Sequence, residues 1–146
     1  MSSFQTIEIK KFKPTVTVLV KNWEKVKGTN CLNVKVSLHN NSADTLFFYN
    51  MSCSWEDIYR INSKGIKIYN ESICFRNSPV IVKLAPFKSY DNVLKLYKDV
   101  ENKKNSMVFS IGLNLVEVKP NDYFFKKWRE LDMSKNIIWS NSITVK

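Results

Sequence analysis

A strict alternation of apolar and polar side chains between Leu32 and His39 constrains the fold most. Every second residue from Leu32 to Leu38 is leucine or valine, and the residues between them are polar. A period of two is what a half-buried β-strand requires. Turn-forming residues follow at 40–44, and a second run at 45–51 resumes with aromatic and apolar side chains. The pattern predicts two strands joined by a turn.

Further strand-like runs follow at short spacing along the chain. They cover residues 4–9, 15–20, 65–69, 80–84, 90–97, 107–115 and 137–145. Turn signals separate the runs, and most connections are too short to hold the helices of an α/β fold. The chain is therefore predicted to be all-β, an antiparallel immunoglobulin-like β-sandwich of about 7–9 strands. Its length favours one domain that spans residues 1–146.

One helix is expected near residues 122–133. Asp122 can cap its first turn, and Phe124, Trp128 and Leu131 recur at the spacing of a single helical stripe. This short helix would cross one end of the sandwich, because it lies between the last two strong strands.

The net charge is +10, from 23 Lys+Arg and 13 Asp+Glu. Only Arg60, Arg76 and Arg129 are arginine, the residue best suited to bidentate recognition of phosphates and bases. A solvated basic surface is therefore favoured over a nucleic-acid site. The alternative, a basic surface that binds nucleic acid or another anionic polymer, would use Lys10, Lys11, Lys13, Lys126, Lys127 and Arg129.

The sequence offers little for catalysis, cofactors or metal ions. His39 is the single histidine, so a histidine metal cluster is not expected. Three glycines are too few for a phosphate loop or a dinucleotide fingerprint. Glu56 and Asp57 are adjacent carboxylates, and charged loop residues are the preferred interpretation. We assign no catalytic, cofactor-binding or metal residue and expect a protein that is not an enzyme.

Aromatic side chains gather between residues 47 and 59. Trp55 has polar neighbours, which suits an exposed ring that stacks on a ligand. The competing interpretation is that these rings fill the core, as most aromatics of small β domains do. If exposed, the ligand or partner surface would consist of Phe47, Tyr49, Trp55 and Tyr59.

Three cysteines, Cys31, Cys53 and Cys74, lack the C-x-x-C spacing of zinc and redox motifs. In an oxidising compartment one disulfide can form, and we expect it between Cys53 and Cys74. Three buried thiols are the alternative. No apolar run is long enough for a transmembrane helix, and residues 1–12 lack the apolar core of a signal peptide. Either the protein is intracellular or its export signal was removed from this sequence.

Four short pieces of the chain are familiar in combination. They are N-N-S-x-D-T-L at 40–46, M-S-C-S-W at 51–55, L-A-P-x-x-S at 84–89 and I-W-S-N at 138–141. Together they resemble a loose group of uncharacterised bacterial proteins, usually exported, with an immunoglobulin-like sandwich. The resemblance covers about residues 34–145, rests on turns and strand edges, and carries no functional residues.

This resemblance implies a periplasmic or cell-surface protein. With the strand pattern and the aromatic segment, it favours a non-enzymatic binding or interaction module within an exported bacterial protein. Its partner would be an unknown protein or glycan. An edge strand would supply backbone hydrogen bonds, and aromatic pockets would supply selectivity.

Overall fold

The computed structural model describes residues 12–70, 74–99, 106–118 and 136–146. All regular elements in these residues are β-strands, apart from one short 3₁₀ turn, η1 (Trp55–Ile58). Every strand pair is antiparallel, which confirms the all-β antiparallel prediction. The helix expected near 122–133 and the strand expected at 4–9 lie outside the described residues. Within these residues no helix is long and apolar enough to cross a membrane.

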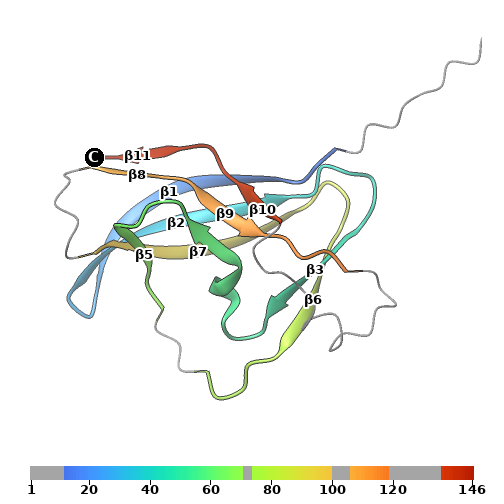
Figure 1. The fold of residues 1–146 in the computed structure, drawn as a ribbon, viewed down its shortest axis with the longest axis horizontal. Coiled ribbons are helices and arrows are strands. Elements are labelled where there is room, and N and C mark those ends of the chain that lie inside the picture. The colour runs from blue at the N-terminus through green and yellow to red at the C-terminus, as the bar shows by residue number, and fades with distance from the viewer. Residues whose placement is uncertain (1–11, 71–73, 100–105, 119–135) are drawn as a thin grey trace, which may run out of the picture.

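The largest sheet contains four strands in the order β1 (Thr15–Val26), β2 (Thr29–His39), β7 (Ser89–Lys98) and β5 (Ile66–Ile68). Figure 1 shows β1, β2 and β7 running side by side. Lys27 and Gly28 join β1 to β2 with φ values of 47° and 84°, the left-handed conformation that tight hairpin turns use. The strand run predicted at 15–20 is too short, because β1 continues to Val26. A register shift between Val20 and Trp23 breaks the alternation at the point where the predicted run ends.

The remaining strands form three small sheets. One contains β10 (Ile137–Trp139), β9 (Ile111–Asn114) and β4 (Tyr59–Ile61). The other two pair β11 (Ile143–Val145) with β8 (Met107–Phe109) and β3 (Leu46–Met51) with β6 (Pro79–Leu84). Hydrogen bonding therefore divides the strands among four sheets, whereas the predicted sandwich has two.

The long strand predicted over 107–115 is interrupted at Ser110. The Ser110 N–H donates to Asn62 Oδ1 at 2.7 Å, and the Ile111 N–H donates to Ser140 Oγ at 3.0 Å. These side-chain acceptors replace a continuous ladder at the junction. As a result β8 and β9 pair with different strands, although their alternation of side chains is continuous.

One cluster of buried side chains draws on all four sheets. Val34 and Leu94 face it from neighbouring strands of the large sheet, and Phe48, Phe109 and Leu113 face it from the small sheets. Each of these five is at most 1% exposed. Burying a side chain of this size contributes about 1.5–3 kcal/mol. The large sheet and the small sheets are therefore held together by a common core.

Candidate functional site

The four aromatic residues predicted to form a surface fall in two places. Phe47 and Tyr49 pack with Val116 and Val118, and Tyr49 is only 1% exposed. The Tyr49 N–H donates to the Val116 carbonyl at 3.0 Å, and the Val118 N–H donates to the Phe47 carbonyl at 3.0 Å. The segment after β9 thus pairs with the edge of β3, and its two valines pack beside Tyr49. Tyr49 belongs to the interior, and Phe47 is half-buried at its margin.

Trp55 and Tyr59 lie together at η1. Their rings meet edge to face with centroids 6.3 Å apart. Tyr59 is buried, and its hydroxyl accepts a hydrogen bond from Asn92 Nδ2 at 2.8 Å. Burial raises the pKa of the Tyr59 hydroxyl, and the Asn92 hydrogen bond opposes part of this effect. Tyr59 therefore supports Trp55 from behind, and Trp55 alone of the four lines a cavity.

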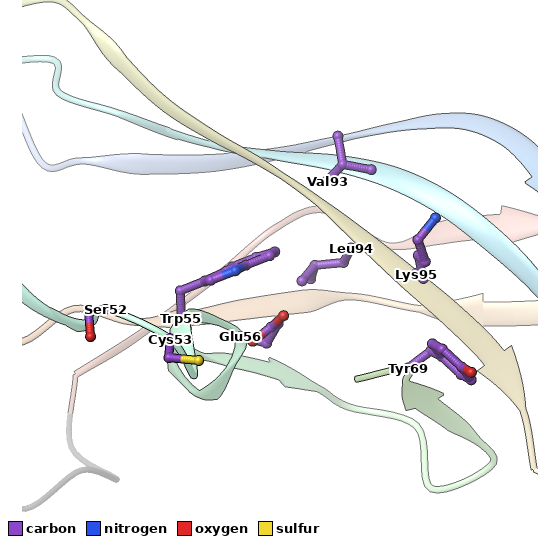
Figure 2. A pocket seen from close by; sticks show the side chains of 8 residues that line it. All are labelled: Ser52, Cys53, Trp55, Glu56, Tyr69, Val93, Leu94 and Lys95. Carbon is purple, nitrogen blue, oxygen red and sulfur yellow. The ribbon is translucent and has the colours of Figure 1, made fainter. Parts of the chain in front are cut away.

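This cavity has a volume of about 350 Å³ and lies between β7 and the segment that leads into η1 (Figure 2). Its volume is at the lower end of the range for ligand pockets. The side chains around it come from the end of β3, η1, the end of β5 and the middle of β7. They are Ser52, Cys53, Trp55, Glu56, Tyr69, Val93, Leu94 and Lys95.

Covalent and polar contacts hold the wall that leads into η1. Cys53 and Cys74 form a disulfide, with Cα atoms 5.9 Å apart, which is the pair expected from the sequence. Asn77 Oδ1 accepts the backbone N–H groups of both Cys53 and Ser54 at 3.2 Å. Asn77 Nδ2 donates to Ser54 Oγ at 2.7 Å. The segment before Trp55 is thus fixed to the chain that precedes β6.

The opposite wall is an edge of β7. Leu94 points to the core and is 1% exposed, whereas Val93 points outward and is 49% exposed. Successive side chains of a strand point to opposite faces of the sheet. The cavity is lined by both of these residues and by Lys95, so it must lie along the hydrogen-bonding edge of β7 rather than over one face. Figure 2 shows Leu94 directed toward Trp55 and Val93 directed away from it.

Backbone groups of β7 at this edge have no strand partner among the described residues. β5 pairs only with residues 96–98, and the last contact is the Tyr69 N–H donating to the Lys95 carbonyl at 2.7 Å. In an antiparallel strand the N–H and C=O of one residue point to the same side, and the side alternates along the chain. Asp91 and Val93 therefore direct their backbone groups to the same side as the Lys95 carbonyl, and Val93 lines the cavity there.

Two charged side chains line the cavity, and only one is neutralised within the described chain. Lys95 Nζ forms an ion pair with the Glu24 carboxylate and donates to Asn33 Oδ1 at 3.3 Å. Glu56 Oε2 is buried, and no described group donates a hydrogen bond to it. Figure 2 places the Glu56 side chain between Trp55 and Tyr69. Among the described residues, the cavity thus combines an aromatic ring, a strand edge with no strand beside it and a carboxylate with one buried oxygen that accepts no hydrogen bond.

The adjacent carboxylates of Glu56 and Asp57 separate in the structure. Glu56 lines the cavity, whereas Asp57 is exposed. Nothing in the sequence distinguishes these two acids; they separate because a 3₁₀ turn directs neighbouring side chains to different sides.

His39 lies on the outer face of the large sheet between two hydroxyl groups. Its Nε2 is 2.7 Å from Thr17 Oγ1, and its Nδ1 is 2.7 Å from Ser89 Oγ. A hydroxyl beside an imidazole is one part of a nucleophile–base pair, but a catalytic triad places a carboxylate on the other ring nitrogen. The contacts of His39 instead connect three neighbouring strands.

Lysines on the outer face of the large sheet are paired with acids. Lys35 Nζ is 4.0 Å from the Asp91 carboxylate, and Lys67 Nζ is 3.5 Å from the Asp99 carboxylate. Of the six cations considered for nucleic acid, only Lys13 is among the described residues. Within those residues, the cationic groups of this face are largely neutralised by their neighbours.

No family model, curated protein or solved structure matches this chain. The resemblance to exported bacterial sandwich proteins therefore stays a prediction.

Sequence reasoning missed Tyr69, Val93, Leu94 and Lys95 as cavity residues. The run at 90–97 was recognised as a strand, but the alternation of its side chains does not reveal how far a neighbouring strand extends. The signal that could have helped is the shortness of the run at 65–69, which can cover only part of a ten-residue strand.

Proposed function

We propose that this protein is a non-enzymatic binding module that takes its ligand into the cavity between β7 and η1. Within the described residues, the observation that carries the proposal is a buried Glu56 oxygen with no hydrogen-bond donor, which lies beside Trp55 and an edge of β7 that has no strand partner. Ligand sites typically combine apolar or aromatic walls with a few polar groups that fix orientation. The disulfide and the Asn77 contacts hold one wall in place, so the site is largely formed before a ligand arrives.

We also propose that the protein is exported, to the periplasm or the cell surface. The Cys53–Cys74 disulfide supports this location, because disulfides persist in oxidising compartments. The shared core supports an immunoglobulin-like sandwich, since the two layers of a sandwich bury their inner faces against each other.

The test is a binding screen of the purified protein on a glycan array and on an array of extended peptides. The protein should bind members of one array. Trp55→Ala should weaken that binding by about tenfold or more, as truncation of a central aromatic anchor does. Trp23→Ala is the matched control, because Trp23 is 47% exposed and lies on β1, outside the cavity lining. Trp55→Phe provides a second variant that keeps an apolar ring against the core.

Unfolding in urea establishes that each variant is folded. If the wild-type protein binds no member of either array, the proposal is contradicted. Retention that is equally strong in the Trp55 variants would place the binding site elsewhere and contradict it as well.

A second candidate is a binder of nucleic acid or another anionic polymer, which the net charge of +10 favours. We rank it second because three lysines of the large sheet are already ion-paired. It predicts retention on heparin and on DNA that falls steeply with salt, as release of counterions requires. Absence of retention at low salt would remove it.

A further inference from the structure

We infer that the ligand is an extended peptide that adds a strand to the edge of β7 and places one lysine or arginine side chain against Glu56. The inference rests on the proposed function, because it assigns the occupant of the same cavity.

The backbone of β7 offers a hydrogen-bonding edge to this peptide. β5 follows β7 through Ile66, Lys67 and Ile68 and then leaves it after the Tyr69 contact. The N–H and C=O groups of Val93 and Asp91 continue the same edge without a described strand beside them. Peptides bind such edges by completing the ladder of backbone hydrogen bonds. From residue 91 to residue 95 the edge spans about 13 Å, which suits four residues of an extended peptide.

The side chains around the cavity suit one cationic residue of the peptide. Trp55 and Leu94 offer apolar surface, and the Glu56 carboxylate lies beside them. Lysine and arginine combine an apolar stem with a cationic head, so one such side chain fits both features. A buried carboxylate oxygen without a hydrogen-bond donor is costly, and a cation from the ligand removes that cost.

Lys95 does not supply this cation from within the chain. Its ammonium group is held by the Glu24 carboxylate and by Asn33 Oδ1. Turning it toward Glu56 would break both contacts and leave the Glu24 carboxylate without its partner. A cationic side chain from outside meets no such competition.

The charge of the whole protein limits the peptide further. At +10, the protein repels polybasic segments over distances of about a Debye length, roughly 8 Å at physiological salt. A peptide with one cationic residue among neutral or acidic neighbours can pair with the Glu56 carboxylate without this repulsion. The ligand class is therefore an extended, neutral to acidic peptide with a single lysine or arginine at the cavity.

The experiment uses acetylated and amidated peptides of about nine alternating threonine and valine residues with an acidic residue near each end. Lysine, arginine or glutamine occupies the central position. Fluorescence anisotropy measures binding to the wild-type protein and to Glu56→Gln and Val93→Pro. Asp57→Asn is the control for Glu56→Gln, since Asp57 is the adjacent acid outside the cavity lining. Val93→Thr is the control for Val93→Pro, since threonine keeps the N–H group.

The lysine and arginine peptides should bind the wild-type protein about tenfold or more tightly than the glutamine peptide. Glu56→Gln should abolish this preference, and Asp57→Asn should keep it. Val93→Pro should weaken all three peptides by about tenfold or more, whereas Val93→Thr should not. Proline is tolerated at a strand edge whose N–H faces away from the ladder, so Val93→Pro should remain folded.

The remaining outcomes separate this inference from the proposed function. Peptides that bind in a Val93-dependent manner but with equal affinity for lysine and glutamine would overturn the cationic assignment and leave the proposed function standing. Binding of glycans alone, weakened by Trp55→Ala but not by Val93→Pro, would overturn the peptide inference. The proposed function would again stand. A protein that binds neither the peptides nor the glycan array would overturn both.

Discussion

The two halves of β7 belong to one strand but have different neighbours. Leu96 pairs with both β2 and β5, whereas residues 93–95 pair with β2 on one side and border the cavity on the other. Leu96 is fully buried, and Val93 is 49% exposed. Alternation along a strand thus decides which side chains are buried, whereas the length of the neighbouring strand decides which backbone groups are available to a ligand.

Side chains, rather than a second strand, hold the first half of β7 in place. Asn92 donates to the Tyr59 hydroxyl at 2.8 Å. Tyr90 meets Phe48 edge to face with centroids 5.3 Å apart, and its hydroxyl accepts a hydrogen bond from Asn50 at 3.0 Å. An edge held in this way is already ordered before binding. The protein therefore loses less conformational entropy when a peptide pairs with it.

The largest effect should be in stability, and it should separate the two faces of β7. Leu96→Ala should lower the free energy of unfolding by about 2–5 kcal/mol, because it leaves a cavity in the shared core. Val93→Ala removes an exposed side chain and should change it by about 0.5 kcal/mol or less. Urea unfolding measures both. Equal losses would mean that Val93 is packed as tightly as Leu96.

The disulfide that holds the far wall of the cavity should have the next largest effect. Cys53 and Cys74 are separated by 21 residues, so replacing both by serine should cost about 3 kcal/mol through the entropy of the unfolded chain. A thiol reductant should lower the urea midpoint of the wild-type protein and leave that of the double variant unchanged. If the double variant is as stable as the wild-type protein, the disulfide does not form in solution.

Tyr59, which supports the first half of β7, should make stability sensitive to high pH. Its folded pKa is raised above the ordinary value of 10.0, so above pH 10 the unfolded chain binds fewer protons than the folded one. This group therefore lowers stability with rising pH by up to about 1.4 kcal/mol per unit. The wild-type advantage over Tyr59→Phe should narrow between about pH 9 and 11. An advantage that stays constant would show that Tyr59 is not buried.

The sequence was sufficient for the strand content and insufficient for the neighbours of each strand. Alternation located β2 and β7, and the spacing of turn residues located the breaks between strands. It did not reveal that Ser110 divides one apolar run between two sheets, because the division depends on Asn62 and Ser140, which are distant in sequence. The end of β1 was missed for a related reason, since a bulge after Val20 hides the pattern.

The candidate site was only partly accessible from the sequence. Trp55 was selected for its polar neighbours and does line the cavity. Tyr49 has a similar composition around it but is buried, because Val116 and Val118 cover it. Glu56 could not be separated from Asp57, since both are acidic residues of one short turn. The difference arises from the orientation of η1 against β7, which a single sequence does not encode locally.

Amide hydrogen exchange along β7 tests the unpaired edge most directly. The Leu94 N–H points toward β2 and should exchange slowly, near the limit set by global unfolding. The Val93 N–H points to the cavity and should exchange within about tenfold of an unstructured peptide, then slow when the lysine peptide is added. A Val93 amide that is as protected as that of Leu94 without any peptide would contradict the account, because it would mean that the edge is already occupied.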